Sequence, residues 1–175
     1  MVESSAITRT IRLDKELDDV LQKIARDEKV TVNSIVNRCL RQFVDWDRHA
    51  DKFGMATIRP ALLTELISRL SVDEARQLGR DSVKDSLRPA IEYIFVEFSL
   101  PNFIEFMRRF ARYSGRFEFE DSVDGRKHVI LVRHSTGLKW SAYYEGMVRG
   151  IFEDELGIKI KASAGPESFT GTFEV

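Results

Sequence analysis

The chain has 175 residues, of which 27 are basic and 28 acidic, so its formal net charge is −1 at pH 7. Because the basic and acidic residues are nearly equal in number, the chain has no overall positive electrostatic field. This argues against a protein that coats DNA without regard to sequence. The single cysteine excludes an internal disulfide framework and favours the cytoplasm. The polar first five residues predict no signal peptide, and acidic residues interrupt the most apolar run, so no membrane partner is expected.

The first predicted element is a short strand over residues 8–13, in which polar and apolar residues alternate. Successive side chains of a strand point to opposite sides, so Thr8, Thr10 and Arg12 share one face, with Ile11 and Leu13 on the other. Hydroxyl groups can bond either base type in the major groove, and arginine can bond the edge of guanine. This pattern predicts DNA base contacts by Thr8, Thr10 and Arg12. The alternative is an ordinary solvated edge strand.

Two amphipathic helices follow the strand. Asp14 is a candidate N-cap for the first helix and Thr31 for the second. Apolar residues recur with helical spacing in both helices, at positions 17, 20, 21, 24 and 25 and at 35, 36, 39, 40, 43 and 44. A unit of about 45 residues makes too small a core to bury such faces alone, so a dimer is implied. Cys39 lies on the apolar face of the second helix and is expected in the core.

Residues 7–46 resemble the ribbon-helix-helix (MetJ/Arc/CopG) superfamily, with Thr8, Thr10, Arg12, Asp14 and Thr31 at the matching positions. The resemblance implies an intertwined dimer that reads the major groove with a two-stranded ribbon, one strand from each copy.

The resemblance also implies that backbone amides at Thr31, Val32 and Asn33 hold a DNA phosphate at the start of the second helix. Arg9 and Lys15 are further candidate phosphate contacts. Two positions depart from the pattern. Lys29 stands where the family usually has glycine, so it is expected in a left-handed conformation, and Arg9 stands where an apolar residue is usual.

The charges of residues 1–50 balance, with nine basic and nine acidic side chains. Affinity for bulk DNA is therefore expected to be weak and to depend on a local patch around Arg12, Lys15 and the helix amides. A specific regulator fits this balance better than a chromatin-coating protein.

A charged stretch after Trp46 ends at Gly54, where we place the domain boundary, giving domains 1–54 and 55–175. Pro60 suits the first turn of a helix, and Ser71 with Glu74 predicts a capping box that opens another. Further helices are expected over residues 83–98 and from Pro101 onward.

The remaining residues predict two hairpins around a helix. Phe117 and Phe119 alternate with acidic residues, and Asp124-Gly125 supplies a turn before a buried strand over 129–132. A helix from Leu138 ends near Gly157, and two further strands flank Gly165-Pro166. The predicted fold class is α+β, with an N-terminal ribbon-helix-helix, a helical segment and an antiparallel β-β-α-β-β domain.

Ser135, Thr136, Gly137 and Lys139 mark a strand-to-helix junction that is a candidate anion or ligand site. An ordinary capped helix is the alternative. His128 and His134 lie six residues apart on one predicted strand, about 20 Å by the strand rise, so a single metal ion cannot join them. No metal site or cofactor is predicted.

We expect a cytoplasmic, sequence-specific DNA-binding regulator of transcription, and not an enzyme. Its expected partners are double-stranded DNA and a second copy, with tetramers as a further state. The C-terminal domain either assembles dimers or binds a small-molecule effector. The alternative function is an antitoxin-like or other protein-interaction module that uses its N-terminal part mainly to dimerise.

Overall fold

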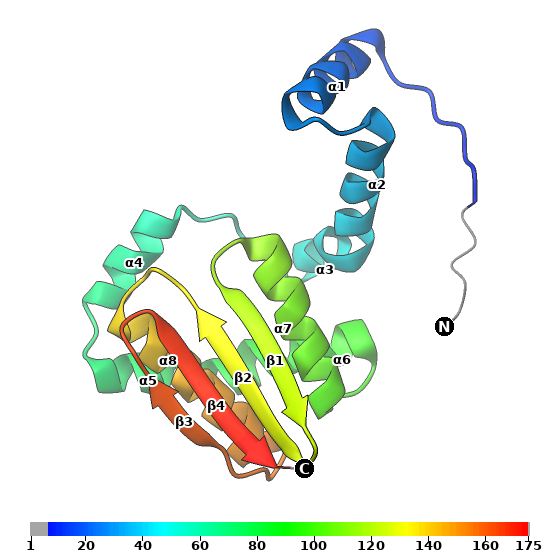
Figure 1. Ribbon diagram of the computed structural model, residues 1–175. Helices are drawn as coiled ribbons and strands as arrows, with labels where there is room; N and C mark the ends of the chain where they lie inside the picture. The colour runs from blue at the N-terminus through cyan, green and yellow to red at the C-terminus, as the bar shows by residue number, and fades with distance from the viewer. Residues whose placement is uncertain (1–6, 175) are drawn as a thin grey trace. The chain divides into compact units, whose positions relative to one another are not determined.

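The computed structural model describes residues 7–174, and its contacts divide the chain into two compact units (Figure 1). Unit 1 ends at Asp45, and unit 2 begins at Trp46. The sequence predicts a boundary near Gly54, nine residues later than Asp45. The difference arises because Trp46 is buried in the core of unit 2 and Phe53 packs against that core.

Unit 1 contains both helices that the sequence predicts, α1 (Lys15–Glu28) and α2 (Val32–Gln42). Asp14 is the N-cap of α1, with extended backbone, but its side chain makes no capping hydrogen bond. Thr31 caps α2 in full, because its Oγ1 accepts a hydrogen bond from the Ser34 amide at 3.1 Å. Local sequence signals therefore located both helix starts.

Lys29 ends α1 in the left-handed conformation, with φ 55° and ψ 42°. In this conformation the next amide, Val30 N, donates to Ala25 O at 2.9 Å, which satisfies one of the last carbonyls of the helix. The conformation expected for a lysine at a glycine position is thus confirmed.

The N-terminal segment corrects the predicted fold. The sequence predicts a strand over residues 8–13, whereas the structure has neither strand nor helix there, and all four strands of the described chain lie beyond residue 117. A strand exists only where its backbone bonds a neighbouring strand. Residues 7–13 make no backbone hydrogen bond to another described residue. A ribbon-helix-helix fold within the single chain is therefore wrong.

The helices between α2 and the sheet are short and mostly consecutive. Pro60 and the capping box hold as predicted: Ser71 Oγ accepts from Glu74 N at 3.1 Å, and Ser71 N donates to Glu74 Oε2 at 2.6 Å. One helix ends earlier than predicted, at Phe95. In chain order the elements are η1 (Phe43–Asp47), α3 (Arg48–Ala50), η2 (Asp51–Phe53), α4 (Pro60–Ser68), α5 (Val72–Ser82), η3 (Val83–Leu87), α6 (Arg88–Phe95) and α7 (Leu100–Ser114).

The C-terminal part of unit 2 is one antiparallel sheet of order β1-β2-β4-β3, which confirms the β-β-α-β-β prediction. Phe119 pairs with Val132, and Val132 pairs with Phe169 across the next strand. The elements are β1 (Glu118–Asp124), β2 (Lys127–Arg133), α8 (Leu138–Arg149), η4 (Gly150–Glu155), β3 (Lys161–Ala164) and β4 (Ser168–Glu174).

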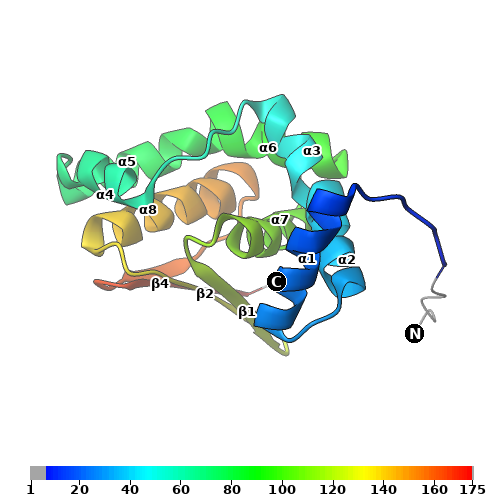
Figure 2. The ribbon, with the colours of Figure 1, turned by 90° about the horizontal axis from the view of Figure 1, so that it is seen from above.

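In unit 2 the helices cover one face of the sheet and leave the other face uncovered (Figure 2). Strand residues that point toward the helices are buried, because alternation places every second side chain on the covered face. Phe152 of η4, for example, lies with its ring centroid 4.5 Å from that of Phe173 on β4. The largest fully buried side chains of unit 2 include Phe103, Phe106, Phe152, Phe169, Ile91 and Met107.

Two glycines let α5 and α8 approach closely. A Cβ added at Gly146 would lie 1.8 Å from the carbonyl oxygen of Arg76, and one added at Gly79 would lie 2.0 Å from that of Tyr143. Only glycine permits backbone-to-backbone contact of this kind. These two positions fix how α8, and with it the sheet, sits against the helical layer.

Candidate nucleic-acid interface

The predicted base-reading residues lie on the open N-terminal segment of unit 1. Thr8, Thr10 and Arg12 are all exposed. Ile11 and Leu13, expected on a hidden face, are also exposed, at 55% and 37%. The expected burial fails because the described single chain places no second layer against this segment.

The candidate phosphate contacts gather around two helix starts. Thr31 and Asn33 are exposed and Val32 is half-buried. The amides of Val32 and Asn33 belong to the first turn of α2, where no intrahelical acceptor exists, and none of their hydrogen bonds is found among the described residues. Side chains keep this turn in place, since Asn37 Nδ2 donates to Asn33 O at 2.9 Å. The arrangement leaves donors directed outward at the positive end of a helix dipole.

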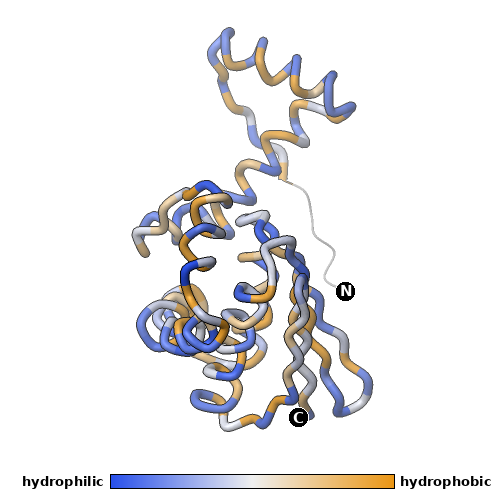
Figure 3. Tube along the Cα trace, turned by 90° about the vertical axis from the view of Figure 1, so that its left-hand side faces the viewer, coloured by the Kyte–Doolittle hydropathy of each residue, from blue (hydrophilic) through white to orange (hydrophobic). Residues whose placement is uncertain are grey.

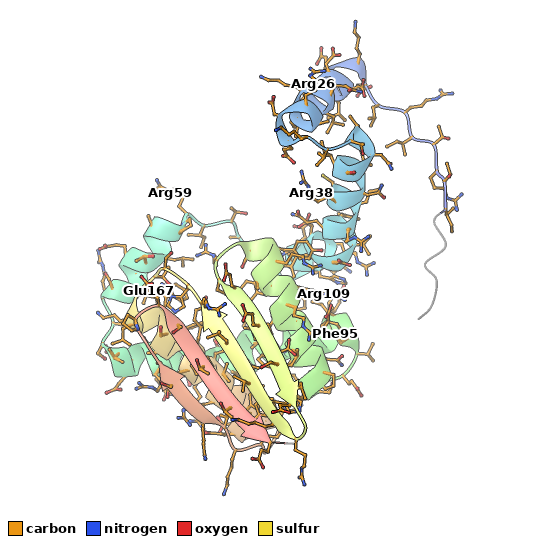
Figure 4. All side chains as sticks on the ribbon, in the orientation of Figure 1. Arg26, Arg38, Arg59, Phe95, Arg109 and Glu167 are labelled. Atoms are coloured by element: carbon orange, nitrogen blue, oxygen red, sulfur yellow. The ribbon has the colours of Figure 1, made fainter. Side chains whose placement is uncertain are left out.

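Cationic side chains accompany these donors. Arg9, Arg12 and Lys15 are exposed and have no ion-pair partner in the described range 7–174. Arg38, by contrast, pairs with Glu28 at 3.0 Å and holds the end of α1 against α2 (Figure 4). Exposed, unpaired cations can neutralise phosphates at little desolvation cost.

Unit 1 leaves most of its large apolar side chains exposed. In its described part the buried apolar residues are Ala25 and Ile35, although Figure 3 shows apolar residues along both helices. Cys39, expected in the core, is exposed as well. Its burial fails for the same reason as that of its neighbours, since α1 alone cannot cover the apolar face of α2. The exposed set is Ile7, Ile11, Leu13, Leu17, Val20, Val30, Leu40, Phe43 and Val44.

The predicted anion site of unit 2 is largely occupied by internal contacts. Lys139 Nζ donates to the Ser68 carbonyl at 2.6 Å, and Thr136 bonds His134. Gly137 is the N-cap of α8 with φ 89°, a conformation that favours glycine. Ser135 is exposed and has no hydrogen bond among the described residues. These bonds describe a rigid strand-to-helix turn.

His134 is the centre of that turn, and sequence analysis missed its main partner, Ser141. The Thr136 amide donates to His134 Nδ1 at 3.2 Å, so Nδ1 is unprotonated and Nε2–H donates to Ser141 Oγ at 2.9 Å. Burial lowers the pKa of His134 from 6.5, which keeps the ring neutral. Ser141 is fully buried and cannot meet a substrate, so the pair is structural. The sequence signal for this pair is a histidine at the end of a strand, followed by a glycine and then by a serine seven residues after the histidine.

A cavity of about 740 Å³ lies beside His134 at the end of the sheet. Its walls carry Arg116, Arg133 and Glu167, and Figure 4 shows Glu167 at the loop between β3 and β4. Arg133 is paired with Glu120 at 2.5 Å, and Arg116 Nη2 donates to Ile58 O at 2.8 Å. The mixed charge of the walls suits a small polar molecule better than an extended polyanion.

The described residues contain no cluster of three or more His, Cys, Asp or Glu side chains placed to hold a metal ion. In residues 7–174, no helix has both the length and the apolar composition to cross a membrane. Comparisons with family models, with curated proteins and with solved structures find no match.

Proposed function

We propose that the chain is a sequence-specific DNA-binding regulator of transcription that acts in the cytoplasm as a dimer. Thr8, Thr10 and Arg12 of both copies enter the major groove and contact bases. The amides of Thr31, Val32 and Asn33 bind phosphate, assisted by Arg9 and Lys15. The protein is not an enzyme and carries no cofactor.

The observation that carries this proposal is the exposure of unit 1. The described part of unit 1 presents nine exposed large apolar residues. Six of them lie between residues 17 and 44, and three lie on the open segment of unpaired backbone over residues 7–13. A monomer of this size gains too little from burial to hold such a surface in water. A second copy covers the apolar faces of unit 1, while Thr8, Thr10 and Arg12 remain free for DNA.

Unit 2 serves the regulator as an assembly or effector-binding domain. It has its own buried core and a cavity at the end of the sheet, so it does not depend on unit 1 for its stability. Either role would couple the spacing of two DNA-binding units to the state of unit 2.

Fluorescence anisotropy on the DNA upstream of the protein's own gene, measured over a salt series, tests the proposal. We expect the wild type to prefer this DNA to random DNA. Arg12→Ala should lose about 1–3 kcal/mol of specific binding, because it removes a base contact. Arg9→Ala should weaken binding to all sequences alike and lower the salt slope by about one.

Lys23→Ala is the matched control, since Lys23 is an exposed cation of α1 outside the proposed interface. Circular dichroism and sedimentation establish that each variant keeps its fold and mass. Equal, weak binding of wild type and Arg12→Ala to every DNA would overturn the proposal.

The second candidate function is an interaction module, such as an antitoxin, in which unit 1 dimerises and a protein partner replaces DNA. The even charge balance of residues 1–50 favours it, because that region has no strong general attraction for DNA. The same anisotropy result that overturns DNA reading would support this candidate.

A further inference from the structure

The uncovered face of the sheet in unit 2 is a candidate interaction surface. The side that faces the helices buries Ile130, Val132 and Phe169. The residues next to them in sequence therefore point to the opposite side of the sheet. The open sheet face thus has Val129 and Leu131 at its centre, with Thr170 and Thr172 beside them in register. All four are half-buried by their neighbours, yet no helix of unit 2 lies over them (Figure 2).

The two edges of the open sheet face carry opposite charge, while the inner strands present Lys127 and Arg133 of β2 and Glu174 of β4 on the same face. Edge strand β1 presents Glu118, Glu120 and Asp124 outward and no basic residue. At the other edge, Lys159 and Lys161 flank the buried Ile160, so both lysines point away from the core. Arg133 of β2 pairs with Glu118 and Glu120. Asp124, Lys159 and Lys161 have no ion-pair partner in the described part of the chain.

We propose that the open sheet face binds the same face of a second copy, about a two-fold axis that runs parallel to the strands between β2 and β4. This axis places the acidic edge of each copy over the basic edge of the other. An axis across the strands would instead place acidic edge over acidic edge. The order β1-β2-β4-β3 makes the parallel axis self-complementary, because β1 and β3 are the outermost strands. Stacked sheets of this kind pack about 10 Å apart.

The inference deepens the assembly role in the proposed function and rests on it for affinity. Four strands of up to seven residues span roughly 450 Å² in projection, at about 4.8 Å between strands and 3.4 Å per residue. A standard interface buries about 800 Å² on each partner. The contact is therefore weak alone, and the dimer of unit 1 raises the local concentration of the second sheet.

Charge reversal tests the sheet contact separately from unit 1. The full chain carries Leu40→Glu, which places a charge in the apolar face of α2 and should prevent dimerisation through unit 1. In this background, sedimentation equilibrium from micromolar to millimolar concentration should show a weak monomer–dimer equilibrium. Glu120→Lys with Asp124→Lys, or Lys159→Glu with Lys161→Glu, should each weaken it by about tenfold or more, because like charges then face each other.

An equimolar mixture of the two reversed chains is the decisive arm, because its heterodimer restores opposite charges at both edges. We expect the mixture to associate as tightly as the parent. A parent that stays monomeric at every concentration, reversed chains that associate normally, or a mixture no better than its components would overturn the inference. Failure of the proposed function would give a different result. The chain with Leu40 intact would then show no preference for its DNA and would associate no more tightly than the Leu40→Glu chain.

Discussion

Unit 1 and unit 2 differ in where they place their apolar side chains. Each unit exposes nine large apolar residues, but unit 1 buries only Ala25 and Ile35 in its described part, whereas unit 2 buries most of a large aromatic core. Burial of apolar area is the main source of folding free energy. Unit 2 therefore has a large source of folding free energy within its own core, whereas the described part of unit 1 has a small one.

The largest effect should come from breaking the packing that makes unit 2 self-sufficient. In Gly146→Ala the new Cβ would meet the Arg76 carbonyl at 1.8 Å, so α8 must move away from α5. We expect a loss of more than about 3 kcal/mol in the free energy of unfolding, measured by urea denaturation. Gly165→Ala is the control, because its Cβ would meet its nearest neighbour at an ordinary 3.4 Å. Similar stability of the two variants would contradict the close helix contact.

The second prediction tests the dependence of unit 1 on a partner. Leu40 of α2 and Leu66 of α4 are exposed to similar extents, 55% and 52%. If a second copy covers α2, Leu40→Ser should weaken the dimer by about 2 kcal/mol for each copy. Leu66→Ser should change little, since it lies outside both proposed interfaces. Sedimentation equilibrium gives the dissociation constants, and equal small effects would show that α2 stays exposed.

The same difference between the units explains which elements the sequence predicts well. Thr31, Ser71 and Asp124-Gly125 act on neighbouring residues, so helix starts and the hairpin follow from local chemistry. The predicted strand over residues 8–13 fails because a strand requires a partner strand, and none pairs with it among residues 7–174. Alternation gives the faces of a strand but no information on what covers them.

The candidate sites follow the same rule. The capped start of α2 was predictable, since Thr31 and the amides beside it are consecutive in sequence. The bond between His134 and Ser141 was not, because it depends on how α8 turns back against β2. The division before Trp46 lies upstream of the predicted boundary for a similar reason, since the ring partners of that residue lie some sixty residues later, at Phe106 and Phe110.

The third prediction concerns pH and unit 2. Burial lowers the pKa of His134 from 6.5, so the unfolded chain binds a proton on this ring more readily than the folded chain. With respect to His134, the free energy of unfolding is therefore highest above about pH 6.5 and decreases as the pH falls below it. His134→Gln should lose about 1 kcal/mol at pH 7.5 through its hydrogen bonds.

The urea midpoint of His134→Gln should also change less between pH 7.5 and 5.5 than that of the wild type. His49 provides the comparison, because burial, with Arg48 nearby, lowers its pKa as well and gives a pH dependence of the same sign. His49→Gln should therefore keep the part of the pH dependence of the urea midpoint that is due to His134. A wild-type midpoint that is constant over this range would contradict the neutral, buried histidine.

The smallest effects should come from two strained positions, one in each unit. Lys29 and Val96 both have positive φ, at 55° and 73°, a conformation that glycine adopts without steric cost. Val96 is β-branched and 91% exposed, so no burial offsets its strain. Val96→Gly should stabilise unit 2 by about 1 kcal/mol, and Lys29→Gly should stabilise unit 1 by about half as much.

These two substitutions also separate the units energetically. If unit 1 folds only with its partner, the gain from Lys29→Gly appears as a tighter dimer, and the unfolding temperature of unit 1 should rise with protein concentration in the wild type and the variant alike. The gain from Val96→Gly should be independent of concentration, because the core of unit 2 lies within one chain. Thermal unfolding at several concentrations measures both. An unfolding temperature of unit 1 that does not change with protein concentration would mean that unit 1 is stable as a monomer despite its exposed apolar surface.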